Sequence, residues 1–207
     1  MPQKLAIIDY GVGNLHSVYK KMQQLKADVF VTANPKEIRG ADKIILPGIG
    51  NFGRGIQNLR NFNLVEVLNE EVLVCKKPVL GICLGLQLMA VSSEEAPEEK
   101  GLGWLEGTVV RFHVSDTTHI RIPHIGWNQL ELKKENVLTQ NLSISAEFYF
   151  SHSYHLAGLD ASIVLAETMY GYPFVSAVSR EHIFGVQFHP EKSHEQGIKI
   201  FENFLNF

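Results

Sequence analysis

Apolar residues in the N-terminal half alternate between short runs and longer stretches at helical spacing. From Leu15 to Leu25 they recur every three or four positions behind Asn14, a good N-cap, which predicts an amphipathic helix. A second helix with apolar residues on one side is predicted over Asn63–Lys77. The short runs predict strands at Leu5–Ile8, Val29–Thr32, Lys43–Leu46 and Val79–Ile82.

Alternating strands and helices favour an α/β fold, a doubly wound and mainly parallel sheet flanked by helices. After Gly103 the chain changes to shorter extended pieces separated by Gly, Pro and Asn, which predict additional antiparallel strands in the C-terminal half. These pieces lie at 108–112, 128–132, 147–150, 163–167, 175–178 and 183–188. A closing helix carries Ile198, Phe201, Phe204 and Leu205. Because no linker or repeat interrupts the pattern, residues 1–207 are predicted to form a single domain.

The totals are those of a soluble globular protein, with 45% hydrophobic and 20% charged residues. Nineteen basic against 22 acidic residues give a net charge of -3, so electrostatics give no reason to expect nucleic acid or an anionic membrane as a partner. We expect no signal peptide and no membrane span. Two cysteines, Cys75 and Cys83, in neither CxxC nor zinc spacing, indicate a reduced, cytoplasmic setting.

Candidate chemistry centres on the segment VLGICLGLQLMA at Val79–Ala90. An apolar strand ends at Cys83, between Gly81 and Gly85, and a helix-compatible stretch follows at once. This is the pattern of a nucleophile elbow, where glycines allow backbone segments to approach closely around an exposed nucleophile. The helix N-terminus favours the thiolate form of such a cysteine. The alternative is a buried strand cysteine, and the cysteine alone does not separate the two.

Active sites of doubly wound sheets lie at the carboxyl ends of the strands, which brings the PGIGNFG segment at 47–53 beside the elbow. Its three glycines let backbone amides approach a ligand closely. We expect an oxyanion hole made of the Leu84 amide and a second donor from Gly48, Ile49 or Gly50. A plain turn is the alternative interpretation of this segment.

A nucleophilic cysteine needs an imidazole to take its proton and a third group to orient that imidazole. Among nine histidines, His189 stands out because it follows a predicted strand and begins the sequence HPE. In extended chain, two-residue spacing points His189 and Glu191 the same way, and Pro190 stiffens the link. Together with the elbow, this favours a Cys83–His189–Glu191 catalytic triad over a simple loop histidine.

Neither a metal nor an organic cofactor is expected. The histidines show no HExxH spacing and no pairing with cysteine, so no metal site is predicted. Residues Gly11 and Gly13 begin a pattern similar to a dinucleotide fingerprint, but His16 stands where its third glycine is needed.

With these residues assembled, the chain resembles the class I, triad-type glutamine amidotransferases. GICLGLQ and GVQFHPEKS match the two signatures of those enzymes, and further matches are DYGVGN at 9–14, LPGIGNFGRG at 46–55, PHIGWN at 123–128 and FYFSHSYH at 148–155. These further segments are similar to the glutaminase subunits of imidazole glycerol phosphate synthase, and the matches extend over the whole chain.

The resemblance implies a reaction and a substrate site. Cys83 would attack the side-chain amide of L-glutamine, His189 would protonate the departing ammonia, and water would then hydrolyse the glutamyl thioester to glutamate. The substrate-binding positions implied are Gln87, Gly48, Ser151, His152 and Ser153. For Gln87, a polar position on a helix surface is the alternative interpretation.

The resemblance also implies a partner, a separate (βα)8-barrel cyclase that forms a heterodimer with this chain. The barrel would receive ammonia at the shared interface and use it to make imidazole glycerol phosphate in histidine biosynthesis. Positions expected to face it are Asn14, Pro123, His124, Trp127 and Lys192.

Other functions stay open at this point. Segments 101–107 and 191–204 look more like a paralogous branch from bacterial surface-polysaccharide gene sets, in which a similar pair supplies ammonia to amidate a nucleotide-linked sugar. A noncatalytic regulatory domain and a self-sufficient cysteine hydrolase are two further alternatives. Intact Cys83, His189, Glu191 and Gln87 argue against the regulatory domain.

Overall fold

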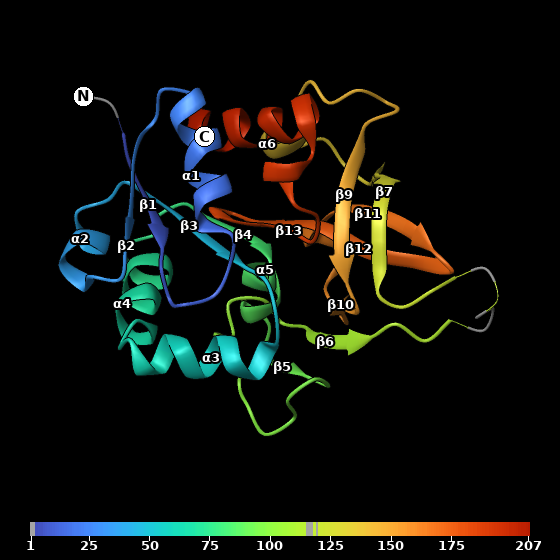
Figure 1. The fold of residues 1–207 in the computed structure, drawn as a ribbon, viewed down its shortest axis with the longest axis horizontal. Coiled ribbons are helices and arrows are strands. Elements are labelled where there is room, and N and C mark those ends of the chain that lie inside the picture. The colour runs from blue at the N-terminus through green and yellow to red at the C-terminus, as the bar shows by residue number, and fades with distance from the viewer. Residues whose placement is uncertain (1–2, 115–117, 119) are drawn as a thin grey trace.

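An eight-stranded sheet crosses the molecule in the computed structural model, which describes residues 3–114, 118 and 120–207 (Figure 1). Its order is β2–β1–β3–β4–β13–β12–β11–β8. The strands from β2 to β13 run parallel, and the remaining pairs are antiparallel. The bounds are β1 Lys4–Ile8, β2 Asp28–Thr32, β3 Lys43–Gly48, β4 Val79–Cys83, β8 Glu131–Leu132, β11 Val164–Tyr170, β12 Tyr172–Arg180 and β13 Ile183–Val186.

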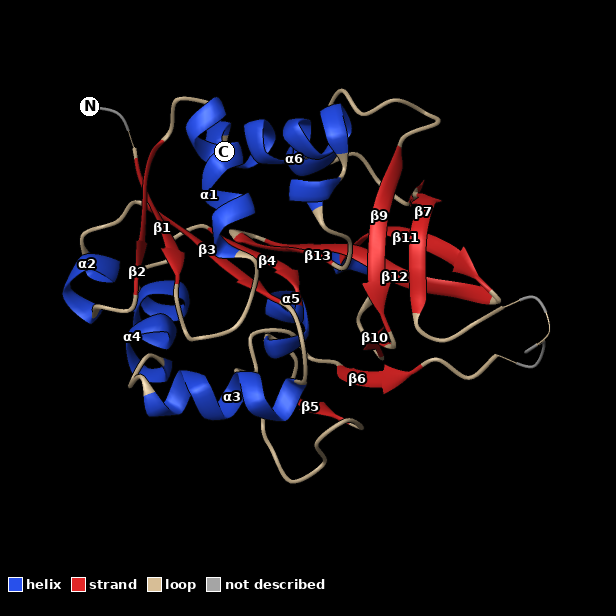
Figure 2. Ribbon diagram, viewed as in Figure 1, coloured by secondary structure: helices blue, strands red, loops and turns tan. Residues whose placement is uncertain are grey.

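Helices cover both faces of this sheet (Figures 1 and 2). On one face lie α1 (Leu15–Gln24) and α6 (His194–Asn206), and on the other α2 (Pro35–Arg39), α3 (Phe52–Asn61), α4 (Val65–Asn69) and α5 (Leu84–Leu88). Strand residues alternate between the two cores, as the pleat requires: Leu80 and Ile82 join one, and Val79 the other. No helix in the described part of the chain is long and apolar enough to cross a membrane.

Two smaller sheets lie beside the antiparallel strands β11 and β12 of the large sheet (Figure 1). Strand β6 (Thr108–Arg111) lies between β5 (Ser92–Ser93) and β10 (Tyr154–Ala157), and β7 (His124–Gln129) pairs antiparallel with β9 (Glu147–His152). Short helical turns η2 (Val137–Thr139) and η3 (Ala161–Ile163) lie between strands, and η4 (Pro190–Lys192) lies between β13 and α6. The predicted fold class, a mainly parallel doubly wound sheet with added antiparallel strands, is confirmed.

Two helical segments differ from expectation. Helix α3 was not predicted. It begins at Phe52, inside the glycine-rich segment 47–53, because Asn51 caps it and its glycines serve packing. A Cβ on Gly55 would lie 3.0 Å from Leu88 of α5. The helix predicted over Asn63–Lys77 is shorter and divides into α4 and a π-helical segment, η1 (Glu70–Val74).

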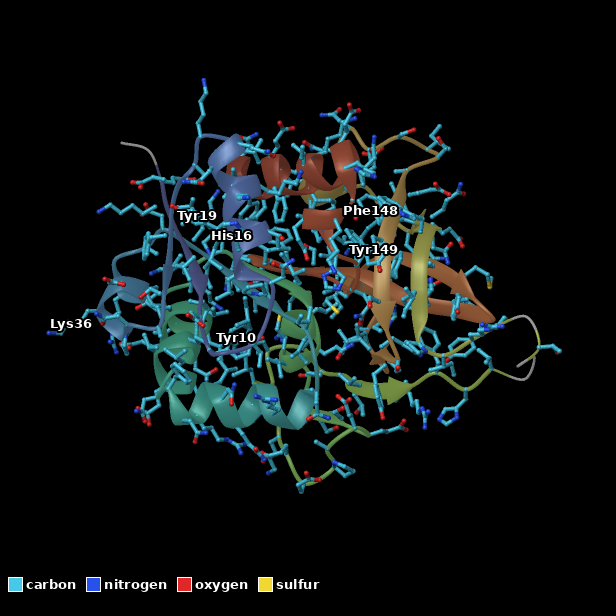
Figure 3. The ribbon with its side chains drawn as sticks, viewed as in Figure 1. Tyr10, His16, Tyr19, Lys36, Phe148 and Tyr149 are labelled. Carbon is cyan, nitrogen blue, oxygen red and sulfur yellow. The ribbon has the colours of Figure 1, made fainter. Side chains whose placement is uncertain are left out.

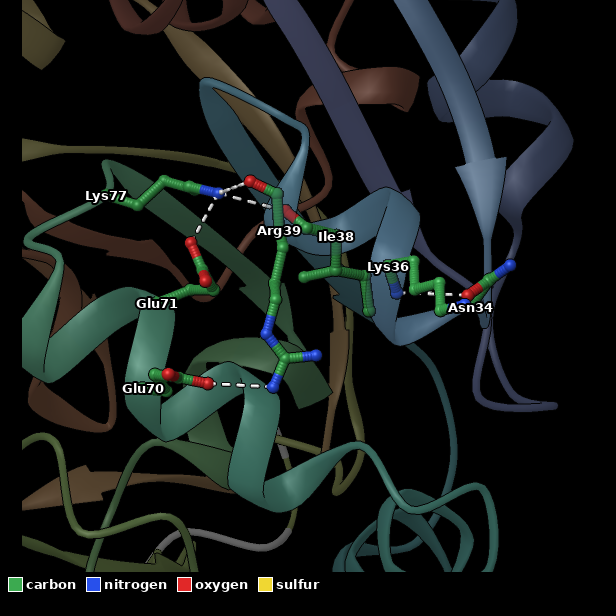
Figure 4. Close-up of polar contacts among 7 residues, drawn as sticks. All are labelled: Asn34, Lys36, Ile38, Arg39, Glu70, Glu71 and Lys77. Atoms are coloured by element: carbon green, nitrogen blue, oxygen red, sulfur yellow. Dashed lines mark hydrogen bonds and ion pairs between the residues drawn. The ribbon is translucent and has the colours of Figure 1, made fainter.

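A buried ion pair ties η1 to α2 (Figure 4). The Lys77 ammonium lies 2.6 Å from the Glu71 carboxylate and donates to the carbonyl oxygens of Ile38 and Arg39 at 2.9 and 3.1 Å. These carbonyls belong to the end of α2, where orphan acceptors need partners. Because the buried charge is both paired and hydrogen-bonded, it can fix this corner of the helical layer.

Candidate active site

Cys83 has the backbone of a nucleophile elbow. It ends β4, it is the residue before α5, and its φ of 52° and ψ of -107° fall where side chains other than glycine are strained. Such strain costs about 1–3 kcal/mol and persists only where the surrounding structure enforces it. The side chain is 5% exposed. An ordinary strand cysteine needs no such conformation, so the geometry favours the elbow over the structural interpretation.

The glycines beside Cys83 are required by close packing. A Cβ on Gly85 would overlap the carbonyl oxygen of Leu46 in β3, and one on Gly81 would lie 2.8 Å from the Leu86 amide nitrogen. The elbow is therefore pressed between β3 and its own helix, which leaves the nucleophile little freedom to move.

His189 and Glu191 form a buried pair at the end of the strand beside the elbow. Strand β13 pairs in parallel with β4, with Val186 opposite Ile82, and His189 follows three residues later. Its Nδ1 donates to Oε1 of Glu191 at 2.9 Å. The two side chains meet through the tight turn η4 rather than through extended chain as expected. The other ring nitrogen, Nε2, is buried and has no hydrogen-bond partner among the described residues, so it is the one free to move a proton.

The charges around His189 favour its protonated form. Burial alone would lower its pKa, but the negative charge of the Cys83 sulfur and the hydrogen bond and charge of Glu191 raise that pKa to about 10. At neutral pH the ring of His189 therefore favours its imidazolium form. A positive charge beside a cysteine stabilises the thiolate form that a cysteine nucleophile needs.

The end of β3 and the residues that follow it, 47–50, form a segment that lies against the elbow. Gly48 is opposite Cys83 in the strand register, and a Cβ there would lie 3.0 Å from Cβ of Leu84. Gly50 has a φ of 113°, a backbone conformation that favours glycine. The structure thus brings the loop that contains Gly48, Ile49 and Gly50 together with Leu84, as an oxyanion hole requires.

Tyr10 supports this loop, and sequence reasoning missed it. Tyr10, labelled in Figure 3, follows β1. Its buried hydroxyl donates to the Pro47 carbonyl at 2.7 Å, and burial raises its pKa, which keeps it a neutral donor. The same hydroxyl fills the space beside Gly48, where a Cβ would overlap it. The feature of the sequence that could have pointed to Tyr10 is its position directly after a strand and Asp9.

Gln87 lies one turn into α5 with a buried side chain. Its Nε2 donates to the carbonyl oxygen of Tyr154 at 2.8 Å and to Oε1 of Gln187 at 3.1 Å. Gln187 in turn places its Nε2 3.6 Å from the Cys83 sulfur. Sequence reasoning also missed Gln187, although it lies within the GVQFHPE segment.

The other expected substrate positions gather at the end of β9. Ser151 and Ser153 are half-buried, and His152 between them is buried, with Nδ1 donating to the Tyr154 carbonyl at 2.8 Å. Burial holds the pKa of His152 well below its ordinary value, so the ring is neutral. His152 and Gln87 thus meet at one backbone oxygen.

The positions expected to face a partner lie mostly at the surface around β7. Trp127 is 43% exposed and stacks on His194 at 4.8 Å, and the Lys192 ammonium lies 5.2 Å above the Tyr149 ring. Pro123 is exposed, and Asn14 is half-buried and caps α1. His124 differs: it is 2% exposed and stacks between Phe150 and Tyr170, so its side chain lies beneath the surface.

Within the described ranges, no group of three or more His, Cys, Asp or Glu side chains is placed to hold a metal ion.

The family model described as "Glutamine amidotransferase class-I" matches residues 6–206. "Imidazole glycerol phosphate synthase subunit HisH 1" of Campylobacter jejuni is 44% identical over 97% of this chain and 98% of its own length. "Imidazole glycerol phosphate synthase subunit HisH 2" of Pseudomonas aeruginosa is 42% identical with the same coverage. Among solved structures, PurLQS from Thermotoga maritima superimposes with a TM-score of 0.76 at 18% identity, covering 100% of this chain and 99% of that one. That last similarity shows the fold alone.

Proposed function

This chain belongs to the class-I glutamine amidotransferases, and on that premise we propose that it is the glutaminase subunit of an imidazole glycerol phosphate synthase in histidine biosynthesis. Its 207 residues act as one domain that hydrolyses L-glutamine to glutamate and ammonia. The observation that supports the chemistry best is a strained elbow cysteine beside a protonated histidine anchored on a carboxylate.

In the first half of the reaction, the Cys83 thiolate attacks the side-chain carbonyl carbon of glutamine. The new C–S bond moves an electron pair onto the carbonyl oxygen, and amides of Leu84 and of Ile49 or Gly50 stabilise that oxyanion. His189 then gives its Nε2 proton to the amide nitrogen as the C–N bond breaks. Ammonia leaves, and a glutamyl thioester remains on Cys83.

In the second half, water attacks the thioester while Nε2 of His189 takes its proton. The C–S bond breaks, glutamate is released, and the thiolate and imidazolium are restored. Glu191 keeps the Nδ1 proton throughout, which holds one tautomer and one ring orientation. Because the Glu191 carboxylate accepts its hydrogen bond from the histidine ring, it acts as the orienting member of the triad.

Glutamine binding falls to Gln87, Gly48 and the Ser151–Ser153 segment. These positions come from three elements, α5, β3 and the end of β9, so a substrate bound at the elbow would be held by three separate parts of the fold. The buried Gln87 and His152 side chains supply polar groups held by a shared acceptor. Small, polar and precisely held groups are what a specific amino-acid site needs.

Ammonia passes to a (βα)8-barrel cyclase that binds over β7 as a heterodimer. Asn14, Pro123, Trp127 and Lys192 face it, and His124 supports the strand from beneath. Trp127 is 43% exposed, and a surface tryptophan is a residue that interfaces favour. The subunit works in the cytoplasm with no metal or organic cofactor and without nucleic acid or membrane.

A second candidate is the paralogous subunit that supplies ammonia for amidation of a nucleotide-linked sugar. Methanococcus maripaludis has two relatives with the HisH name, numbered 1 and 2, which are 40% and 44% identical to this chain. One organism can therefore keep two such subunits. With two such subunits, one could supply ammonia to the histidine pathway and the other to a nucleotide-linked sugar, and this is the second function proposed.

The test is glutaminase activity of the purified chain, alone and with the histidine-pathway cyclase barrel of the same organism, with and without the nucleotide ligand of that barrel. Strong stimulation by the liganded barrel supports the first function. No binding and no stimulation, with Cys83 still reactive toward a glutamine-like electrophile, would reject it in favour of the second. A Cys83 that does not react would reject both.

A further inference from the structure

Gln187 is a buried amide in the active site that the triad does not use. Its side chain is 0% exposed, and it stands two residues before His189. Its two polar atoms face two functional side chains: Nε2 lies 3.6 Å from the Cys83 sulfur, and Oε1 lies 3.1 Å from Nε2 of Gln87. A fully buried primary amide has to satisfy both ends, so these contacts fix the side chain.

The orientation of this amide follows from its neighbours. The Tyr154 carbonyl can only accept, so Gln87 must turn its NH2 group toward it at 2.8 Å. The second hydrogen of that NH2 group points to Gln187, which must therefore present its oxygen. The NH2 group of Gln187 is left facing the sulfur, and no flip of either amide satisfies the same set of partners.

The backbone and the neighbouring histidine strengthen the arrangement. The backbone nitrogen of Gln187 donates to the backbone carbonyl of Ser176 in β12 at 2.9 Å, which holds the residue beside the sheet. His152 donates from Nδ1 to the same Tyr154 carbonyl at 2.8 Å, and this reinforces the acceptor that sets the direction of the chain. The donors run in one direction, from Gln87 to Gln187 to the sulfur.

We propose that Gln187 is a positioning residue that donates an N–H to the Cys83 sulfur, aims it and favours the thiolate, with its own orientation set by Gln87 and Tyr154. A hydrogen bond to a charged acceptor is stronger than one between neutral groups, so the donor favours the ionised sulfur over the thiol. The charge of Cys83 acts on two titratable groups, His189 and Tyr10, and both side chains stay in place when Gln187 is replaced. The inference rests on the proposed role of Cys83 as nucleophile.

The test measures the reactivity of Cys83 with iodoacetamide, followed by intact mass across the pH range, in a chain where the exposed Cys75 is replaced by serine. Gln187→Met keeps the length of the side chain and removes the donor. Gln187→Glu keeps the shape, accepts from Gln87 and places an oxygen against the sulfur. Both variants should shift the midpoint of the reactivity profile upward and lower the rate at neutral pH by on the order of tenfold, with the larger effect for glutamate.

The controls separate this role from a structural one. Gln57→Met changes a glutamine that contacts Glu99 at the surface, and it should leave the profile unchanged. Gln87→Met frees the Gln187 amide to turn, so it should give a smaller shift in the same direction, and it tests the idea if the Gln187 variants do not fold. Folded variants with lower thermal stability but an unchanged midpoint would overturn the proposal. A wild-type Cys83 that does not react would instead overturn the nucleophile role itself.

Discussion

Replacing Cys83 by alanine should lower the pKa of His189. In the wild type that pKa is raised to about 10, against the effect of burial, by the charge of the Cys83 sulfur together with the hydrogen bond and charge of Glu191. The alanine variant keeps the burial and Glu191 and removes only the sulfur. The imidazole then loses one of two anions that stabilise its protonated form.

The size of the change follows from the kind of contact. A neighbouring opposite charge moves a pKa by about 1–3 units, and each unit corresponds to 1.36 kcal/mol. We therefore expect a fall of about 1–3 units, or about 1.4–4 kcal/mol of lost interaction between the two groups. A raised histidine pKa stabilises the fold fully below about pH 6.5, and this stabilisation is lost as the pH rises through about 10. The variant should lose it at a lower pH.

The assay is histidine side-chain NMR over a pH titration, with the His189 signals assigned from a His189→Asn sample. Cys75→Ala makes the same chemical change at an exposed cysteine outside the triad, and it should leave the titration unchanged. An unaltered His189 midpoint in Cys83→Ala would refute the charge interaction between Cys83 and His189 and with it the reasoning about the nucleophile.

Four other expected outcomes address the rest of the site. Glu191→Gln should lower kcat by about 10²- to 10⁴-fold, less than loss of the nucleophile, because Glu191 orients the imidazole; equal losses would argue for a direct part in the chemistry. Tyr10→Phe leaves the buried Pro47 carbonyl without its donor and should reduce the free energy of unfolding in urea by about 1–3 kcal/mol. Gly48→Ala should destabilise the fold strongly, because the new methyl group would overlap the Tyr10 hydroxyl. Adding Tyr10→Phe should therefore restore part of the lost free energy of unfolding in a double-mutant cycle, and strictly additive effects of the two substitutions would contradict this. Burial keeps the pKa of His152 low, so below about pH 6.5 the unfolded chain binds more protons than the folded one. The free energy of unfolding should therefore fall by up to about 1.4 kcal/mol for each pH unit by which the pH is lowered there. His152→Gln should flatten that slope.

The elbow and the parallel strands could be predicted because their signals are local. The run from Val79 to Cys83 is buried on both faces and reads as a continuous apolar strand, as central parallel strands do. Glycines on both sides of Cys83 mark the turn. The HPE segment places a histidine and a carboxylate within reach of each other by chain geometry alone.

Helix α3 could not be predicted with the same methods. Gly53 and Gly55 lower the helix propensity of its first turn, and what they supply is space for neighbours distant in sequence. Ala96 would lie 2.9 Å from a Cβ on Gly53. This need for space arises only once the helix is packed. The sequence therefore shows the low helix propensity of the glycines but not the contacts that require them.

Supporting groups of the site were invisible for a similar reason. Tyr10 and Gln187 work through partners 37 and 104 residues away, Pro47 and Cys83. Their residue types are ordinary for a strand end, and no spacing rule joins them to the nucleophile. Only the parallel register of β1, β3, β4 and β13 brings them together.

The division of labour between glutaminase and partner is tested most directly by the complex with the histidine-pathway cyclase barrel, prepared with wild-type chain and with Cys83→Ala. The rate of imidazole glycerol phosphate formation is measured with glutamine and, separately, with free ammonia as the nitrogen source. The proposed function predicts that Cys83→Ala abolishes the glutamine-dependent rate and leaves the ammonia-dependent rate at the wild-type level. Loss of both rates, or survival of both, would contradict it.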